Sequence, residues 1–333
     1  MLRRSTLSRR TVLSMLAGSP WVGMGAAVET ALAASIPPAL ESDEGFPYRG
    51  FDAVPPEHLQ AEGADFAIVI ATSDFALGKD DFRDWIKHAA KAVATYYGKF
   101  PVPTMRLLFM PTEGTAVRGG TTWGYQGVAS RINIGTATTR ETCFDDWVLV
   151  HEMIHTALPD LSRDHLWLAE GIAVYVESIC RVQAGHLKEA QIWGDFVRAM
   201  PKGQPKEGDR GFDFTHSWGR TYWGGATFCL LADLELRKRS SNTVGLQQAL
   251  RAVNAVANHS EDMDIRKILA IADKATGYDV LTSMYEDMRA KPVPTDLDKL
   301  WSDLGVKPEG NTVSLADAAP MAALRKAIVA PLG

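Results

Sequence analysis

The chain has 333 residues, of which 46% are hydrophobic and 23% are charged, and its formal net charge at pH 7 is −5. This composition is typical of a globular protein with a sizeable core, and it excludes disordered and fibrous proteins. Residues 1–33 contain four arginines and one glutamate, a charge of +3, which leaves −8 for the rest of the chain. Nucleic acids bind clustered Lys and Arg, so we expect no nucleic-acid partner for this acidic body.

The N-terminal segment has the parts of an export signal. Arg9 and Arg10 precede a mildly apolar, glycine-containing run over 11–28, and the small residues Ala31-Leu32-Ala33 follow. This arrangement resembles a twin-arginine signal, which directs already folded proteins across a membrane. We therefore expect residues 1–33 to be a signal peptide that engages the twin-arginine translocation machinery and is cut after Ala33. The mature protein is then periplasmic or secreted.

No other stretch approaches the ~20 apolar residues that span a bilayer, so we expect no membrane partner once the signal is removed. The chain has three cysteines, Cys143, Cys180 and Cys229. In an oxidising compartment they allow at most one disulfide. Folding is therefore expected to depend on the hydrophobic core or on a bound metal.

The first structured part of the chain is predicted to be a small sheet. Residues 34–63 are expected to form an extended lead-in, because they are rich in Pro, Gly and acidic residues. Hydrophobic patterning then predicts the following elements of a sheet over 64–135. They are strands over 65–71 and 105–110, a covering helix over 80–97, and a hairpin over 119–135 that ends in an edge strand over 128–134.

From Phe144 onward the pattern is helical, and Pro159 ends the first helix. The expected helices cover 146–158, 165–182, 186–200, 222–238, 244–256 and 262–289. Residues 296–333 are expected to be a C-terminal extension with a short strand at 312–315 and a helix near 321–329. A sheet followed by helices predicts an α+β fold with a mainly helical lobe.

The motif His-Glu-Met-Ile-His at 151–155 indicates a metal site. Residues four apart share a helix face, so His151 and His155 can direct imidazole nitrogens at one metal ion, with Glu152 beside a bound water. A catalytic zinc takes three protein ligands and keeps one position open. We expect Glu170, on the next predicted helix, to be the third ligand of one Zn²⁺ ion, with His165 as the alternative.

The segment 166–177, LWLAEGIAVYVE, resembles the WLNEGFASYVE segment of the gluzincin metallopeptidases. These are peptidase MA-like enzymes and include the aminopeptidase N and glycyl aminopeptidase families. The glutamate of that segment is their third zinc ligand, which the resemblance assigns to Glu170. The resemblance implies a thermolysin-like zincin catalytic domain over 64–295, composed of the sheet 64–135, zinc helices over 144–182 and a helical lobe over 186–295.

A second segment, 221–226, TYWGGA, is similar to the YxKG-containing helix of the same families. There the tyrosine stabilises the tetrahedral intermediate, a role that the resemblance gives to Tyr222. Gly224 stands where those families usually have lysine. The segments that carry the resemblance lie between Phe144 and Arg237.

These residues predict a metallopeptidase mechanism with zinc-activated water, in which Glu152 is the general base and Tyr222 donates to the oxyanion. Glu177 lies seven residues after Glu170 on the same helical face. It is expected either to orient a ligand imidazole or to pack in the structure. His216, six residues before Tyr222, is a candidate second transition-state donor, with a surface role as its alternative.

Aminopeptidase N-type enzymes bind the substrate's free amine through the glutamate of a GxMEN strand. The nearest counterpart here is 127–131, GVASR, in which Ser130 replaces the glutamate and Arg131 replaces the asparagine. Neither side chain can anchor an ammonium group, and Arg131 favours a carboxylate. The sequence therefore favours an endopeptidase that pairs an extended peptide or protein substrate with the 128–134 edge. A catalytically silent exported protein of the same fold and a non-peptide amide hydrolase are the alternatives.

Overall fold

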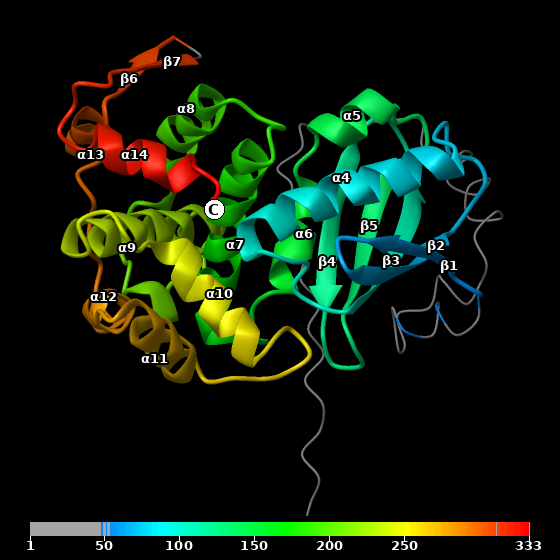
Figure 1. Cartoon of the computed structure of the whole chain (residues 1–333), viewed down its shortest axis with the longest axis horizontal. Helices are drawn as coiled ribbons and strands as arrows, with labels where there is room; N and C mark the ends of the chain where they lie inside the picture. The colour runs from blue at the N-terminus through cyan, green and yellow to red at the C-terminus, as the bar shows by residue number, and fades with distance from the viewer. Residues whose placement is uncertain (1–47, 49–50, 52–53, 311, 333) are drawn as a thin grey trace, which may run out of the picture.

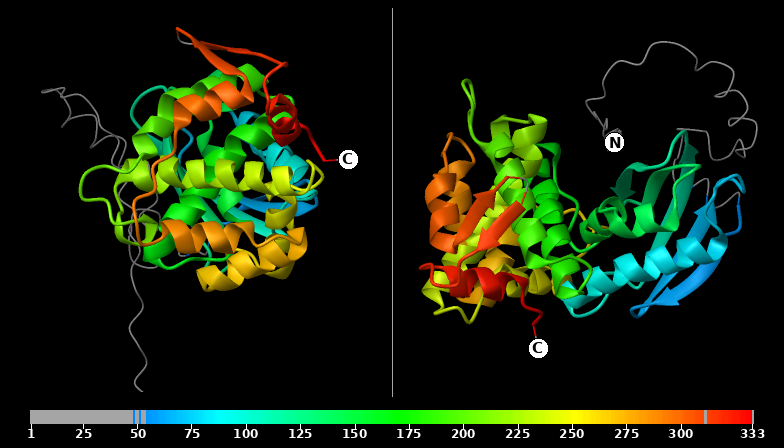
Figure 2. Two further views of the ribbon diagram at one scale, coloured as in Figure 1. Left: turned by 90° about the vertical axis from the view of Figure 1, so that its left-hand side faces the viewer. Right: turned by 90° about the horizontal axis from the view of Figure 1, so that it is seen from above.

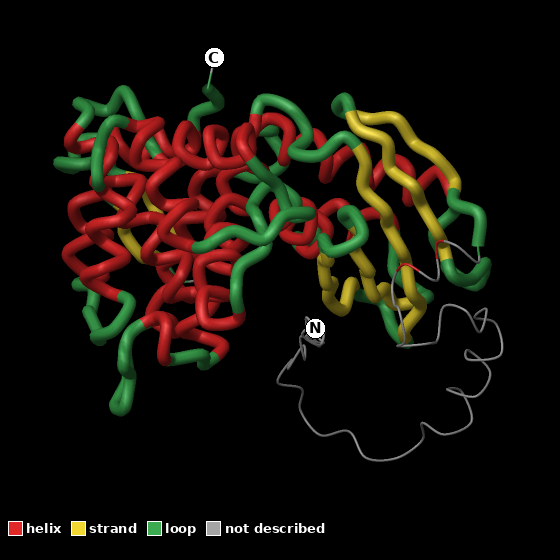
Figure 3. The backbone as a smooth tube through the Cα atoms, turned by 90° about the horizontal axis from the view of Figure 1, so that it is seen from below, coloured by secondary structure: helices red, strands yellow, loops and turns green. Residues whose placement is uncertain are grey.

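The computed structural model describes residues 48, 51, 54–310 and 312–332. The expected signal peptide, 1–33, lies outside the described residues. A sheet region comes first along the chain and a helical region follows, so the predicted α+β class is confirmed (Figures 1 and 3). No helix among the described residues is long and apolar enough to cross a membrane.

Five strands form one mixed sheet in the order β1-β2-β3-β5-β4. Their bounds are Glu57–Ala61 (β1), Ala64–Ile70 (β2), Thr104–Thr112 (β3), Val117–Trp123 (β4) and Ala129–Gly135 (β5). Strands β2, β3 and β5 are mutually parallel, whereas β1 and β4 run antiparallel to their neighbours. Strand β1 lies within residues 34–63, which were expected to be an extended lead-in. Its backbone pairs with β2 over its whole length, so this part of the lead-in belongs to the sheet.

The prediction that residues 128–134 form the edge strand is wrong. Strand β5 is hydrogen-bonded to β3 on one side and to β4 on the other, so β4 is the edge. The burial of the two strands gives the physical reason. Five of the seven β5 residues are buried, as in an interior strand, whereas no residue of the glycine- and threonine-rich β4 is.

Helix α4 (Lys79–Tyr97) covers one face of the sheet (Figure 1). Its Phe82 and Trp85 pack on Phe109 of β3, with ring centroids 4.8 and 5.8 Å apart. The other face carries a smaller apolar cluster that includes Val69, Leu108 and Ala129. Side chains alternate between the faces of a strand. Since Ala129 belongs to the smaller cluster, the next residue of β5, Ser130, points to the face that α4 covers.

The helical region forms one body beside the sheet (Figure 2). Its helices are α6 (Val148–His155), α7 (Leu166–Gln183), α8 (Glu189–Ala199), α9 (Gly225–Arg239), α10 (Leu246–Val256), α11 (Ile265–Thr276), α12 (Val280–Met288), α13 (Leu297–Leu304) and α14 (Ala322–Val329). Helix α5 (Arg140–Asp145) lies over the sheet region and contacts α4 (Figure 1). The single helix expected over 262–289 is two helices, because Gly277 adopts φ 78° and ends α11. The three cysteines are buried and free.

The expected C-terminal extension packs against the helical region. The strands β6 (Val306–Glu309) and β7 (Thr312–Leu315) form an antiparallel hairpin that contacts α8. Helix α14 contacts α7 and α9, and the fully buried Arg325 forms ion pairs with Glu189 and Asp317. A buried guanidinium needs such partners, so these residues are part of the same packed unit.

Helices α7 and α9 cross at two glycines. A Cβ atom on Gly171 would lie 2.3 Å from the carbonyl carbon of Gly225, and one on Gly225 would lie 2.1 Å from the carbonyl oxygen of Trp167. The two backbones are therefore in direct contact. This crossing sets Glu170, the neighbour of Gly171, beside the turn that carries Tyr222.

We expect Gly171→Ala to lower the free energy of unfolding by about 1–3 kcal/mol, because the added methyl group forces the helices apart. Alanine stabilises a helix by ~1 kcal/mol relative to glycine. A decrease in the free energy of unfolding would therefore show that the steric clash outweighs this gain. Urea denaturation measures it. The matched control is Gly194→Ala in α8, where the nearest atom to a new Cβ is the flexible end of Arg198, 3.1 Å away. A Gly171→Ala protein as stable as wild type would contradict the crossing.

Candidate metal centre

Helix α6 presents both histidines of the motif to the same space. Residues 148–154 of this helix are all buried, so its position is fixed by packing on all sides. Asp146 accepts a hydrogen bond from the backbone amide of Val148, 2.7 Å away, where the helix begins. Beyond α6 the chain turns at Pro159 and returns as α7, which contacts α6.

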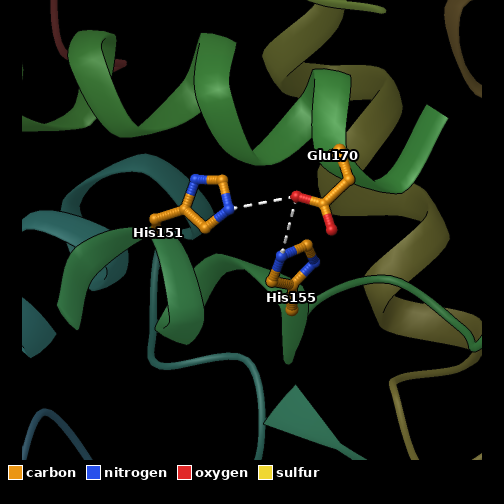
Figure 4. Close-up of side chains that lie close together, drawn as sticks. All are labelled: His151, His155 and Glu170. Atoms are coloured by element: carbon orange, nitrogen blue, oxygen red, sulfur yellow. Dashed lines mark hydrogen bonds and ion pairs between the residues drawn. The ribbon is translucent and has the colours of Figure 1, made fainter. Parts of the chain in front are cut away.

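Helix α7 brings Glu170 to the two histidines (Figure 4). Its Oε2 atom lies 3.2 Å from Nε2 of His151 and 3.6 Å from Nε2 of His155. One ligand atom from each residue lies within 4.8 Å of the other two. His151 and Glu170 are buried and His155 is nearly so, which shields the group from water.

The charges in this group stabilise one another. Burial would raise the pKa of Glu170, but His155 and His151 outweigh that effect and hold the pKa well below its usual range. Burial would likewise lower the pKa of His155, but Glu170 outweighs it and the pKa is raised. Two imidazoles and an ionised carboxylate that converge on one point are a donor set for zinc. The residues present therefore fit the metal that the sequence predicts.

Glu152 lies on the same helix and faces the edge strand β4. Thr122 Oγ1 donates to its Oε2 across 2.6 Å, and a Cβ atom on Gly120 would lie 2.4 Å from its Cγ. Burial raises the pKa of Glu152, although His155, His151 and Thr122 oppose the rise. The strand can approach this carboxylate because residue 120 is glycine. Neither Gly120 nor Thr122 was identified from the sequence, which placed both only within the predicted hairpin over 119–135.

Ser130 and Arg131, the predicted substrate-binding pair, lie on opposite faces of the sheet. Ser130 is fully buried, with its hydroxyl 2.7 Å from Thr122 Oγ1. Because the single proton of Thr122 goes to Glu152, Ser130 donates to Thr122. Arg131 follows on the face away from α6, and its Nε donates to Asn133 Oδ1, 2.9 Å away. The structure does not place the two as a substrate-binding pair.

Tyr222 lies in a π-helical turn, Arg220–Gly224, directly before α9. Such turns recur at functional sites. Its hydroxyl hydrogen-bonds Glu170, and its ring is nearly parallel to that of His151 with centroids 6.3 Å apart. Burial and the carboxylates of Glu170 and Glu152 raise its pKa. The hydroxyl therefore keeps its proton and can act as a donor.

The remaining candidates lie away from the metal-binding atoms. The carboxylate of Glu177 accepts from Arg181 Nη1 at 2.7 Å and from Ser178 Oγ at 3.1 Å. Nδ1 of His151 has no hydrogen-bond partner among the described residues, so the expected contact from Glu177 to a ligand imidazole is not formed. His216 is exposed.

The alternative ligand, His165, belongs to a different cluster. Its Nδ1 lies 3.0 Å from Ser162 Oγ, and its Nε2 lies 3.3 Å from the hydroxyl of Tyr285 and 3.7 Å from Asp213 Oδ2. The group of potential metal ligands found among the described residues contains His151, His155 and Glu170. The distances therefore favour Glu170 as the third ligand.

His259 adjoins the centre, and sequence patterns did not indicate it. Its ring centroid lies 6.4 Å from that of His155, its Nδ1 is 3.2 Å from the carbonyl oxygen of Leu158, and it also hydrogen-bonds the backbone of Thr122. It therefore connects the edge strand to the loop after α6. No local pattern marks this residue, because it lies in a loop far along the chain.

A half-buried acidic group at the start of α6, Asp146, predicts a pH-dependent stability. Burial raises the pKa of Asp146 to about 7, and Glu177 adds to the rise, against opposing effects of Val148 and Arg181. This value lies above that of an unfolded aspartate, ~3.9. The folded state therefore binds the proton more tightly, and stability is lost as the pH rises from about 4 to about 7.

We expect Asp146→Asn to be more stable than wild type near pH 8 and equally stable near pH 4, because an amide stays neutral and still accepts from Val148. Urea unfolding of both zinc-free proteins at the two pH values measures this. A gain of the same size at both would show that the charge of Asp146 is not its cause.

No protein-family model matches the sequence, and no curated protein matches it. Solved structures do match. An aminopeptidase N family protein from Idiomarina loihiensis is 16% identical and gives a TM-score of 0.56 over 80% of this chain and 52% of that chain. An M1 zinc metallopeptidase from Deinococcus radiodurans is 12% identical, with a TM-score of 0.46 over 72% of this chain and 51% of that one. The chain spans about half the length of these structures.

The similarity to the Idiomarina structure shows the class of fold. The five-stranded mixed sheet followed by a mainly helical region resembles the fold of this aminopeptidase N family protein. Within this fold, the buried group of His151, His155 and Glu170 can hold a metal ion.

Proposed function

We propose that the chain is a zinc-dependent metallopeptidase that cleaves internal bonds of a peptide or protein substrate, with Glu152 as general base. The observation that carries the proposal is the convergence of His151, His155 and Glu170, with Glu152 and Tyr222 beside them. The fold similarity to the aminopeptidase N family protein supports it.

The residues around the centre have separate roles in this mechanism. A zinc ion bound there supplies positive charge that polarises the substrate carbonyl and makes a water more acidic. Thr122 donates a hydrogen bond to Oε2 of Glu152. Oε1 is therefore the oxygen that takes the proton from the attacking water and later passes it to the leaving amine. Tyr222 donates a hydrogen bond to the oxygen on which negative charge develops.

The edge strand supports endopeptidase over aminopeptidase activity. Strand β4, Val117–Trp123, contains no acidic residue, and Thr122 is the side chain that contacts Glu152. A free substrate amine needs a carboxylate partner at that position. An extended peptide can pair with the backbone of β4, whose outer edge has no neighbouring strand among the described residues.

The test combines metal analysis with hydrolysis of a broad peptide library in which each peptide is present with a free and an acetylated N-terminus. We expect one zinc per chain, cleavage of both forms, loss of cleavage after chelation and recovery on adding zinc. A zinc-loaded protein that cleaves nothing in the library contradicts the peptidase function, and cleavage of free-amine peptides alone contradicts the endopeptidase assignment.

We further propose that residues 1–33 direct export by the twin-arginine route, with the metal bound before translocation. Metal binding and folding are coupled, and this route carries folded proteins. Replacing Arg9 and Arg10 by lysine is expected to retain the protein in the cytoplasm with an uncut N-terminus, as cell fractionation and mass spectrometry will show. Unchanged export of this variant argues against the route.

A further inference from the structure

Two tryptophans are exposed beside the candidate metal centre. Trp147, directly before α6, exposes 48% of its surface, and Trp218, four residues before Tyr222, exposes 54%. Few large apolar side chains among the described residues are as exposed as these. Exposed apolar groups that gather at one place mark binding sites.

Each indole contacts a ring of the centre. Trp147 packs edge-on against His151, with centroids 5.2 Å apart and an interplanar angle of 84°. Trp218 stacks on Tyr222 at 5.8 Å and 24°. The rings of His151 and Tyr222 are nearly parallel, with centroids 6.3 Å apart. A continuous series of ring contacts through the centre therefore connects the two tryptophans, although 70 residues separate them in the chain.

The other side of the centre has a different character. His155 is flanked there by His259, whose ring is hydrogen-bonded to Leu158 and to the backbone of Thr122. Apolar contact surface is therefore concentrated on the His151 side. A ligand held at the centre would meet indole on one side and imidazole on the other.

Both indoles are held in place while they remain exposed. The Nζ atom of Lys202 lies 5.9 Å from the ring centroid of Trp218, within the range of cation–π attraction. The edge-on contact with His151 restricts the motion of the Trp147 ring. Rigid aromatic surfaces of this kind bind apolar groups at a low cost in conformational entropy.

We propose that Trp147 and Trp218 form a subsite that binds an aromatic or large aliphatic side chain of the peptide next to the bond to be cleaved. This subsite rests on the proposed peptidase function and narrows its substrate class. The metal and Tyr222 would hold the reacting carbonyl, and the adjacent apolar side chain would lie against the two indoles. Peptides with alanine or a charged residue at that position are poor substrates.

The first test does not depend on zinc or on activity. The full chain is labelled with 5-fluorotryptophan, and the Trp147 and Trp218 resonances are assigned from the Trp→Phe variants. N-acetyl-phenylalaninamide is expected to shift both resonances at a concentration about tenfold lower than N-acetyl-alaninamide does. Equal shifts with the two amides, or no shift with either, would overturn the subsite whether or not the protein binds zinc.

The second test links the subsite to the metal centre. On zinc-loaded protein, calorimetry compares N-acetyl-phenylalanine hydroxamate with N-acetyl-alanine hydroxamate. We expect the first to bind about tenfold more tightly, and we expect that preference to disappear in Trp147→Ala and Trp218→Ala. The preference should persist in Phe214→Ala, a comparably exposed aromatic that packs on Arg210.

The alanine probe separates binding from structural damage. Its affinity and the zinc content should stay within about twofold of wild type in both tryptophan variants, and Trp→Phe should restore part of the preference. If the tryptophan variants lose affinity for the phenylalanine and the alanine hydroxamate alike, the tryptophans have a structural role, and the subsite is refuted. A protein that binds no zinc and neither hydroxamate refutes the proposed function instead, and the fluorine spectra still decide the subsite.

Discussion

The Glu152→Gln variant is expected to keep its zinc and to lose peptide hydrolysis, with kcat lower by about 10²–10⁴-fold. Glutamine has nearly the same shape, and its amide oxygen can still accept the hydrogen bond that Thr122 now donates to Oε2. It cannot take up a proton at neutral pH. Steady-state kinetics on a peptide that the wild type cleaves, together with metal analysis, measures both properties.

Thr122→Val is the matched control for this prediction, because it removes the hydroxyl that holds Oε2 and leaves the carboxylate itself. Its kcat should fall by less than that of Glu152→Gln. A zinc-loaded Glu152→Gln protein with wild-type activity would exclude Glu152 as the base. A loss of zinc in that variant would show instead that the carboxylate is needed to form the site.

The second large effect is the loss of metal from Glu170→Ala. This change removes the oxygen that lies 3.2 Å from His151 Nε2 and 3.6 Å from His155 Nε2. Two neutral imidazoles remain, and we expect the zinc affinity to fall by more than ~100-fold, beyond the loss typical of a supporting residue. Metal analysis after dialysis against a weak chelator should find one zinc per chain in wild type and almost none in the variant.

His165→Ala is the control, since His165 is the alternative ligand and its contacts are with Ser162, Tyr285 and Asp213. This variant should retain its zinc. Added zinc should also raise the melting temperature of wild type and of His165→Ala but not that of Glu170→Ala, because a ligand stabilises only a state that binds it. The reverse pattern would make His165 the ligand.

The metal-binding residues were predictable because their geometry is mostly local. His151 and His155 share a helix face by their spacing alone. Pro159 indicated that the helix ends before it and that the chain turns there toward the next helix. The Glu170 assignment needed one further step, the pairing of two consecutive helices. Consecutive elements are usually neighbours in space, so that step was a short one.

Errors arose where a pattern depends on distant partners. The apolar pattern of residues 128–134 identified a strand but not its neighbours, so β5 was taken for the edge. Ser130 and Arg131 were assigned from the similarity of residues 127–131 to a GxMEN strand, which does not show that consecutive residues of β5 point to opposite faces of the sheet. The break at Gly277 was also missed. Hydrophobic periodicity does not show where a glycine adopts a positive φ angle, because that angle depends on the direction in which the chain leaves the helix.

The sequence by itself determined the α+β class, the two histidines on one helical face and the glutamate between them, because these depend on the periods of the helix and the strand. The tertiary structure alone decided which strand lies beside Glu152, that Gly171 and Gly225 bring Glu170 to Tyr222, and that two exposed tryptophans each contact a ring of the same centre. The physical reason is that side-chain periods are set within a few residues, whereas strand order and helix crossings are set by packing between residues far apart in the chain.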